Sequence, residues 1–360
     1  MRPSASGVMD LRTCAWMVRE LGEPVSCTIL LEDNSLLAGG WDGRIKHWSD
    51  EGDLVWEIQT PNRISSMVVY ENCVYSTAGL HLVCIDLKSG QQRWMVALEG
   101  SADAVVTTSE CILAASSVYD IEHNDFIESA IWVLSFDGKL LNTHRMDERP
   151  WTLNSFEDGA LAGLGRPMNG YAILDHQGNI SEQKVDWESP TICATDGDDP
   201  VFGLADGSVR SIDGAVVRTL ESPVSNIAAC ANGYIVADDK GRLDYFEETV
   251  RWKIDGHAIV GLSSGFLING IESCWVARWN GSEGHLVVHS QVDGTELASL
   301  QGHRIHDVAF NENRVVTGCE NGQVFVWDRE LLQRRMEQPS QETSDANRSA
   351  MFEKLRSLRK

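Results

Sequence analysis

A ten-residue pattern that occurs near both ends of the chain constrains the fold more than any other feature of the sequence. Residues 39–48 read GGWDGRIKHW and residues 318–327 read GCENGQVFVW, and in both a glycine-containing turn leads into alternating residues that end in Trp. Related turns have their glycine at positions 207 and 241. Weaker copies occur at residues 80–87, 129–136, 169–176 and 284–291. With these included, neighbouring copies lie about 34 to 50 residues apart, a period that is typical of folds built from repeated small units.

Every unit shows the same order of expected elements. A strand such as RISSMVVY (63–70) is followed by a turn, a second strand that ends in small residues, a tight turn and a third, alternating strand. After another turn comes a fourth strand such as QQRWMVAL (91–98). Four short strands separated by turn residues predict an antiparallel meander. Eight such units can be counted, at residues 24–60, 63–98, 103–146, 149–187, 189–221, 223–255, 257–300 and 303–336.

The repeat count predicts an all-β architecture. One four-stranded sheet cannot bury both of its faces, whereas sheets stacked radially in a closed ring cover one another and leave only short edges. We therefore predict a single β-propeller of four-stranded antiparallel blades over residues 9–336, with eight blades and a short C-terminal helix. Seven blades is the alternative, if one of the weaker units is an insertion.

The N-terminal run 12–21 is expected to complete the last blade and so to close the ring. Its Trp16 matches the fourth-strand tryptophans Trp56, Trp94 and Trp252. In that arrangement the residues LLQRRM at 331–336 are displaced toward the tail.

The last unit, GHRIHDVAFNENRVVTGCENGQVFVWD at residues 302–328, resembles a WD40 repeat. The resemblance implies a buried hydrogen-bond network among a His before the first strand, a Ser or Thr on the second, an Asp in the tight turn and a Trp on the third. The matching positions are His303, Thr317, Asn321 and Trp327 in the last unit, and Asp42 and Trp48 in the first. Because Asn321 stands where the family has Asp, the ionic part of the network is expected to be weaker.

The run IDLKSGQQRW at residues 85–94 is similar instead to the repeat of the quinoprotein-like (PQQ-binding-like) propellers. This resemblance implies that the fourth-strand Trp docks between neighbouring blades as a large apolar wedge. Quinoprotein dehydrogenases usually carry a disulfide between adjacent cysteines, and no two of the nine cysteines here are adjacent. We therefore expect no quinone cofactor.

The chain is acidic, with 53 Asp and Glu against 30 Lys and Arg and a net charge of −23. Nucleic-acid binding usually needs a basic surface that neutralises phosphates, so none is expected of the propeller itself. The cysteines form no CxxC pair and mostly lie in apolar runs, which is typical of reduced, buried thiols. No stretch reads as a signal peptide or a membrane span, so we expect a soluble, cytoplasmic protein that does not bind membranes.

The sequence contains no recognisable catalytic or metal-binding constellation. The run HRIHD (303–307) has two histidines three residues apart, a spacing that on a strand points them to opposite faces. There is no GxSxG, and the glycine-rich GLGRPMNG (163–170) lacks the Lys-Ser/Thr ending of a phosphate-binding loop. We expect no catalytic residues, no cofactor and no metal, and a protein that is not an enzyme.

Two long segments stand out from the repeats. Residues 116–129 and 268–284 are each expected to insert residues between the second and third strands of a unit. They combine aromatic with polar residues, a composition common in loops that bind proteins. The candidate interaction residues are Tyr119, Phe126, Trp275 and Trp279. For the two tryptophans the alternative is that they are core residues on lengthened strands.

The C-terminal tail differs in composition from the repeats. Residues 337–348 are polar and without apolar periodicity, which predicts a flexible linker. Residues 349–360 predict a short, basic amphipathic helix. Its apolar stripe consists of Met351, Phe352, Leu355 and Leu358, and basic residues such as Arg356 and Arg359 flank it. Such a segment can bind a partner's groove, the acidic propeller itself or nucleic-acid phosphate, or it can remain solvated.

These observations favour a non-enzymatic, cytoplasmic scaffold that binds one or more proteins through its loops and its tail. A second hypothesis is a propeller that binds a small ligand, or acts as an enzyme, through its central channel. A third is a component of a nucleic-acid-associated complex, tethered only by the tail.

Overall fold

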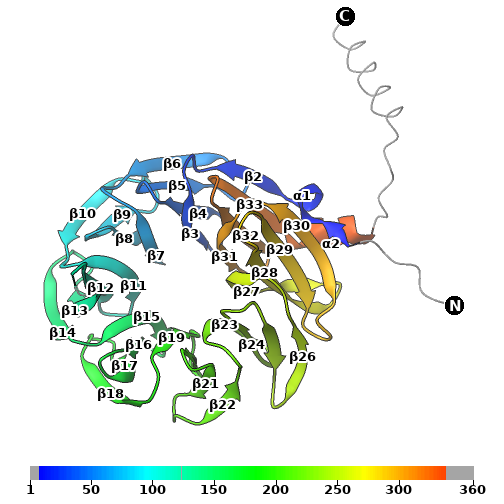
Figure 1. Cartoon of the computed structure of the whole chain (residues 1–360). Helices are drawn as coiled ribbons and strands as arrows, with labels where there is room; N and C mark the ends of the chain where they lie inside the picture. The colour runs from blue at the N-terminus through cyan, green and yellow to red at the C-terminus, as the bar shows by residue number, and fades with distance from the viewer. Residues whose placement is uncertain (1–7, 123, 338–360) are drawn as a thin grey trace, which may run out of the picture.

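The computed structural model describes residues 8–122 and 124–337, which form eight antiparallel sheets arranged radially around one axis (Figure 1). In each blade the first strand lies nearest the axis and the fourth lies at the outside. The predicted eight-bladed β-propeller is confirmed, and the seven-bladed alternative is wrong. Each of the first seven units counted in the sequence is one blade, because consecutive strands pair with each other before the chain moves on, and the eighth unit supplies three strands of the last blade.

The first four blades follow one another along the chain. Their strands are β3 (Val25–Leu30), β4 (Leu36–Gly40), β5 (Arg44–Trp48) and β6 (Leu54–Gln59); β7 (Ile64–Tyr70), β8 (Cys73–Ala78), β9 (His81–Asp86) and β10 (Gln92–Ala97); β11 (Ser101–Thr107), β12 (Ile112–Asp120), β13 (Asp125–Leu134) and β14 (Leu140–Met146); and β15 (Arg149–Phe156), β16 (Gly159–Gly165), β17 (Asn169–Leu174) and β18 (Ile180–Trp187).

The last four blades continue in the same order, except that the outermost strand of the eighth comes from the N-terminus. Their strands are β19 (Thr191–Ala194), β20 (Val201–Leu204), β21 (Ser208–Ser211) and β22 (Val216–Thr219); β23 (Val224–Cys230), β24 (Gly233–Asp238), β25 (Leu243–Phe246) and β26 (Val250–Ile254); β27 (Ala258–Ile268), β28 (Ile271–Trp279), β29 (Gly284–Ser290) and β30 (Glu296–Gly302); and β31 (Ile305–Phe310), β32 (Arg314–Cys319), β33 (Gln323–Asp328) and β2 (Met17–Glu20).

The second strands are the most enclosed part of each blade. Every residue of β4, β8, β16 and β32 is buried. These strands are rich in small residues because both of their faces lie against neighbouring blades close to the axis, where the wedge-shaped sheets have the least space between them. The core is therefore a series of apolar clusters between blades, and most stability is expected from burial there.

Large side chains on the fourth strands join each blade to the next. The indole Nε1 of Trp56 donates a hydrogen bond to the carbonyl of Leu87 at 2.7 Å, and that of Trp94 donates to Phe136 at 3.0 Å. Gly90, at a φ of 70°, lies against the first of these rings, and a Cβ there would be 2.6 Å from Cγ of Trp56. The inter-blade wedge implied by the quinoprotein-like resemblance is therefore present.

The N-terminal segment closes the ring, but not as one continuous strand. Strand β2 pairs antiparallel with β33, and a two-residue strand, β1 (Met9–Asp10), pairs in parallel with β30. Between them Leu11–Cys14 forms the short helix α1 instead of the strand expected over 12–21.

The predicted match of Trp16 to the other fourth-strand tryptophans is wrong by one residue. Trp16 is exposed, whereas Met17 is buried. A Cβ on Gly52 would lie 2.6 Å from Sδ of Met17, which is the relationship that Gly90 has with Trp56. Side chains alternate between the two faces of a strand, so a shift of one residue exchanges the buried and exposed positions.

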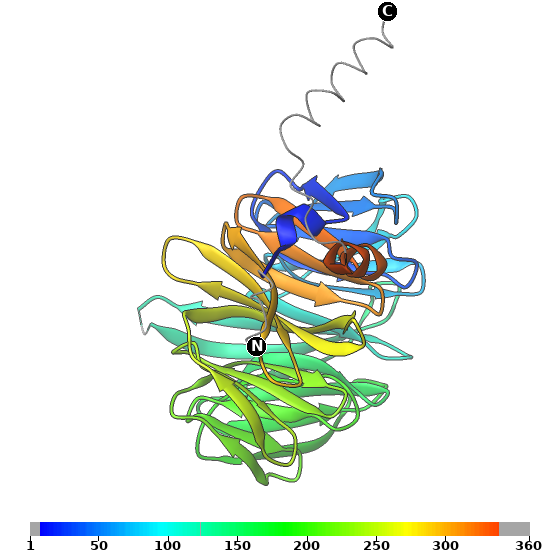
Figure 2. The same ribbon diagram turned by 90° about the vertical axis from the view of Figure 1, so that its right-hand side faces the viewer.

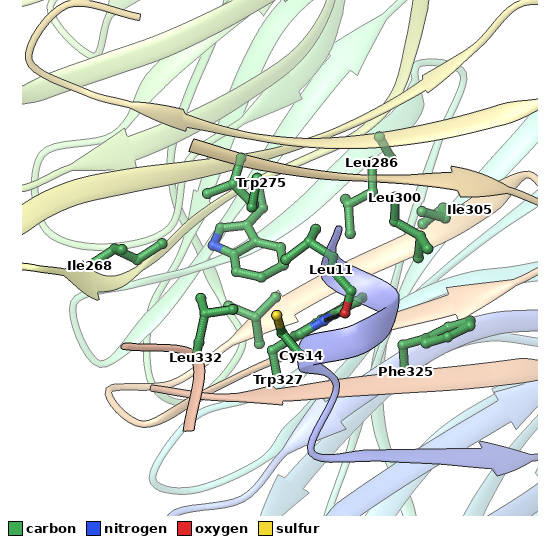
Figure 3. Close-up of a cluster of buried hydrophobic side chains, with 14 of the residues drawn as sticks. Leu11, Cys14, Ile268, Trp275, Leu286, Leu300, Ile305, Phe325, Trp327 and Leu332 are labelled. Atoms are coloured by element: carbon green, nitrogen blue, oxygen red, sulfur yellow. Dashed lines mark hydrogen bonds between the residues drawn. The ribbon is translucent and has the colours of Figure 1, made fainter. Parts of the chain in front are cut away.

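Both helices pack where the two ends of the chain meet. Helix α2 (Arg329–Glu337) follows β33 directly and lies beside α1 at the outer edge of the ring (Figures 1 and 2). Leu11, Cys14 and Leu332 contribute to a core cluster with Trp275 and Trp327, which is named the closure core below (Figure 3). The indole Nε1 of Trp327 donates to the carbonyl of Leu11 at 2.8 Å.

Helix α2 contains the residues 331–336 that were expected to be displaced. The amphipathic helix predicted at 349–360 lies outside the described residues, as does almost all of the linker predicted at 337–348.

Candidate interaction face

One face of the propeller collects two kinds of connection. In an antiparallel meander, the turn from second to third strand and the link from one blade to the next leave from the same end of the sheet. At this end every first strand carries a β-bulge directly after its first ladder pairs, for example between Ile64 and Ser66 and between Ile305 and Asp307. Bulges redirect side chains. We call this face, with the starts of the first strands and the second-to-third turns, the bulge face.

The third blade extends furthest from the bulge face. Strands β12 and β13 are long and form a hairpin that projects from the ring (Figure 2). Near its tip the rings of Tyr119 and Phe126 meet edge to face, with centroids 5.1 Å apart. The Tyr119 hydroxyl donates to Asn124 Oδ1 at 2.6 Å, and 47% of the Tyr119 surface is exposed. The two residues predicted in this segment therefore lie together, with Phe126 half-buried.

Two residues of the fourth blade complete this group. The guanidinium carbon of Arg149 lies 3.5 Å from the ring centroid of Phe126 and 4.0 Å from that of Trp151. Trp151 remains 41% exposed. Stacking between two rings restricts the guanidinium and adds cation–π attraction. Tyr119, Phe126, Arg149 and Trp151 are named the hairpin cluster below.

A carboxylate behind the hairpin cluster holds its cation. Asp103, at the bulge of β11, has Oδ2 at 3.8 Å from a guanidinium nitrogen of Arg149. Burial raises the pKa of Asp103 and lowers the pKa of Arg149, while the charge of each partner opposes that shift. The pair is therefore held in a partly desolvated position between the third and fourth blades, where an unpaired charge would be costly.

A second group of cations and rings lies on the bulge face where the ring closes. The guanidinium carbon of Arg63 is 4.4 Å from the ring centroid of Trp41, and that of Arg304 is 5.5 Å from the ring centroid of Trp279. The ring centroids of Trp41 and His306 are 5.4 Å apart. Trp41, Arg63, Trp279, Arg304 and His306 are named the rim cluster.

The rim cluster repeats one arrangement in two places. Trp41 and Trp279 occupy equivalent positions relative to the bulges. Trp41 follows the residue that pairs with Val25, just before the bulge of β3, and Trp279 follows the residue that pairs with Ile259, just before the bulge of β27. Each tryptophan lies against the guanidinium of an arginine that directly precedes the first strand of the following blade. His306 occupies the bulge of β31, and burial, followed by the charge of Arg304, lowers its pKa. Glu320 opposes that shift and Arg63 adds to it.

The segment 268–284 does not have the predicted layout. It contains the turn between first and second strands, all of β28 and the turn before β29, so it is not one insertion between second and third strands. Trp275 lies in the middle of β28, has no exposed surface and belongs to the closure core, so the core alternative is correct for it. Trp279, at the end of the same strand, is half-buried in the rim cluster.

The WD40 hydrogen-bond network implied for the last blade is not formed. His303 is exposed, and Trp327 donates its indole proton to Leu11 in place of a second-strand hydroxyl. Thr317 is buried, and its hydroxyl lacks a hydrogen-bond partner within the described residues. The N-terminal segment has taken over the Trp327 side of the network, because α1 covers the indole.

The remaining residues of the WD40 resemblance have local roles. Asn321 and Asp42 accept hydrogen bonds within their own turns, from the backbone N–H groups of Gln323 and Arg44. Trp48 is buried in the core between the first and last blades. The tail positions Met351, Phe352, Leu355, Arg356, Leu358 and Arg359 lie outside the described residues.

Residues 8–122 and 124–337 contain no group of three or more His, Cys, Asp or Glu side chains that could hold a metal ion. All nine cysteines are free thiols, and burial raises their pKa wherever a shift is resolved, for example to about 12 at Cys193. Neither of the described helices has the length and apolar character to cross a bilayer.

Most of the residues in the two clusters were missed by sequence reasoning. Arg63, Arg149 and Arg304 each stand directly before the residue that precedes the bulge of a first strand, so aligning the units on the bulge shows three arginines at equivalent sites. Trp41 was read as part of the turn motif alone. Aligning the repeats is therefore enough to find the three arginines, but their stacking on aromatic rings depends on which blades are adjacent.

Comparisons with known proteins agree with this architecture. The profile of the WD domain, G-beta repeat family matches residues 17–49 and 294–328. No curated protein matches the chain. Similar solved structures include Saccharomyces cerevisiae Sqt1, with a TM-score of 0.69 and 11% identity over 87% of this chain and 98% of that one.

Two further solved structures are similar to this chain. BamB from Moraxella catarrhalis has a TM-score of 0.65 at 14% identity, over 87% of this chain and 98% of that one. The computationally designed protein Ika8 has a TM-score of 0.66 at 19% identity, over 86% and 98%. At these identities the likeness shows the fold alone. The chain is therefore an eight-bladed β-propeller with WD40 repeats in the blades that meet where the ring closes.

Proposed function

We propose that this protein is a cytoplasmic, non-enzymatic scaffold that binds one or more proteins through the bulge face of its propeller. The observation that carries the proposal is the hairpin cluster, in which exposed Tyr119 and Trp151 flank Phe126 and a stacked guanidinium. The WD40 matches support it, since WD40 propellers generally mediate protein interactions.

The hairpin cluster has the composition of a binding hot spot. Trp, Tyr and Arg are the residue types most enriched among side chains that dominate interface energies. Ile121 and Ile127, both exposed on the same hairpin, extend the apolar surface. The stacking of Arg149 on two rings and its pairing with Asp103 fix the cluster before any partner arrives, which lowers the entropic cost of binding.

The test is affinity purification of the full-length chain from its own cytosol, compared with two single variants. Trp151→Ala removes an exposed ring of the hairpin cluster. Phe310→Ala is the matched control, because Phe310 is exposed to a similar extent but lies at the far end of β31, away from the bulge face. We expect a stoichiometric partner that the wild type and the control retain and that Trp151→Ala loses.

Two outcomes would contradict the proposal. One is the absence of any stoichiometric partner together with turnover of a substrate by the purified protein. The other is a partner that Trp151→Ala and Phe310→Ala retain or lose equally. Thermal melting of both variants must match the wild type, so that loss of binding is not loss of folding.

A further inference from the structure

The rim cluster differs from the hairpin cluster in the state of its cations. Arg149, the cation of the hairpin cluster, has Asp103 at ion-pair distance. Within the part of the chain that the structure describes, neither Arg63 nor Arg304 forms an ion pair with a carboxylate. Two guanidiniums without a carboxylate partner therefore lie on one rim of a chain that has 53 acidic and 30 basic residues.

Polar atoms of the rim cluster are also enclosed without partners. Nε2 of His306 and Nε of Arg304 have almost no exposed surface and form no hydrogen bond among the described residues. Enclosed polar atoms are usually paired, because burying them without a partner costs free energy. Glu320 is the carboxylate whose charge opposes the lowering of the His306 pKa, and the two residues form no ion pair within the described part of the chain.

We propose that the rim cluster is a recognition site for an acidic peptide segment of a protein partner. The planar guanidiniums of Arg63 and Arg304 suit carboxylates, and stacking on Trp41 and Trp279 leaves their N–H edges free to donate.

The arrangement favours an extended peptide over a small anion. Trp41 contacts both Arg63 of the second blade and His306 of the eighth, and 44% of its surface is exposed. The cations are therefore spread over the second and eighth blades with an aromatic ring between them, instead of converging on one point. A segment with carboxylates on both sides of an apolar residue matches this order, with the apolar side chain on the Trp41 ring.

The inference rests on the proposed function only in taking the partner to be a protein, and it concerns a different cluster.

The experiment selects short random peptides displayed on phage against the immobilised full-length chain. We expect enrichment of Asp or Glu on both sides of an apolar or aromatic residue. The most enriched sequence is then synthesised with a fluorophore and titrated with wild type and variants by fluorescence polarisation.

The variants separate recognition from general charge. Arg63→Ala and Arg304→Ala are each expected to weaken binding of the selected peptide about tenfold. Arg63 is exposed, so its variant should melt like the wild type. Arg251→Ala is the control, because Arg251 is an exposed arginine paired with Glu247 on the sixth blade and should leave binding unchanged. The same peptide with Gln in place of each Asp or Glu should bind at least tenfold more weakly.

Three results would overturn the inference. The first is a set of selected peptides without acidic enrichment, and the second is equal weakening of peptide binding by Arg251→Ala and Arg63→Ala. The third is displacement of the labelled peptide by inorganic phosphate or a single-stranded oligonucleotide at a lower concentration than by the unlabelled peptide. Loss of the cytosolic partner by Trp151→Ala together with one of these results would leave the proposed function standing and remove only this site.

Discussion

Asp307 of the eighth blade accepts two hydrogen bonds from Thr28 of the first, one from its backbone N–H at 2.6 Å and one from its hydroxyl at 2.7 Å. The two residues are 279 positions apart, yet both lie on innermost strands, directly across the closure of the ring. The second and third blades show a related bond, from the backbone N–H of Val105 to the hydroxyl of Ser66. The closure is thus fixed by the same kind of contact as an ordinary blade junction, with a carboxylate in place of a hydroxyl.

Substitution of Asp307 is expected to separate its hydrogen bonds from its charge. Burial raises the pKa of Asp307 more than the Thr28 bonds lower it, so the ionised form is disfavoured in the fold. Asp307→Ala leaves two donors of Thr28 unpaired and should cost about 1–3 kcal/mol of unfolding free energy. Asp307→Asn keeps an acceptor without the charge and should equal or exceed the wild type in urea denaturation at pH 7.

The pH dependence gives the sign of this effect. The pKa of Asp307 in the folded state lies above its unfolded value of about 3.9. Between these two pKa values the folded state binds more protons than the unfolded state, so wild-type stability falls as the pH rises through this range. The advantage of Asp307→Asn should therefore be larger at pH 7 than at pH 4. An advantage that is constant or reversed would show that the carboxylate is not penalised by burial.

The inter-blade wedge can be tested at a glycine. Gly90→Ala places a methyl group 2.6 Å from Cγ of Trp56 at a φ of 70°. We expect a cost of about 1–2 kcal/mol from the left-handed conformation and about 1–3 kcal/mol more from overpacking. Gly270→Ala is the control, because its φ of 77° is similar and a Cβ there would meet no atom within 4 Å. Equal melting temperatures for the two variants would argue against a tight wedge.

Helix α1 is expected to stabilise the closed ring. Leu11 is fully buried in the closure core and its carbonyl accepts the indole proton of Trp327. Leu11→Ala should cost about 2–5 kcal/mol through the cavity that it leaves. Leu54→Ala, at an exposed position of β6, should change stability by no more than about 0.5 kcal/mol. Denaturant titration gives both values, and a cost for Leu11→Ala no larger than that of the control would contradict a closing role.

The Asp103–Arg149 pair should behave as one unit. Arg149→Ala leaves the Asp103 carboxylate partly buried without its cation, and we expect a loss of about 1–3 kcal/mol. Adding Asp103→Asn to that variant should recover part of the loss, because no charge then remains to be desolvated. A double-mutant cycle in thermal unfolding measures this coupling, and simple additivity of the two single changes would show that the residues act independently.

Much of the fold could be predicted because every blade repeats its own local pattern. Strand order within a blade depends on turns only a few residues long, so periodic sequence is enough to count the blades. The closing strand was harder, since Trp16 and Met17 are adjacent and only pairing with β33 decides which is buried. A one-residue choice of this kind depends on a partner strand more than three hundred residues away.

The candidate interaction residues also include some that the sequence could predict and some that it could not. Tyr119 and Phe126 could be predicted because a long polar–aromatic hairpin interrupts the repeat, and local sequence marks it as a loop. Trp275 and Trp279 could not be told apart, because both lie on one lengthened strand and only packing against α1, α2 and the last blade buries the first. By itself, the sequence determined the blades, their number and the segments that interrupt them. Tertiary structure alone decided that Arg63, Trp41, His306 and Arg304 meet on one rim, because closing the ring brings together residues that no local pattern relates.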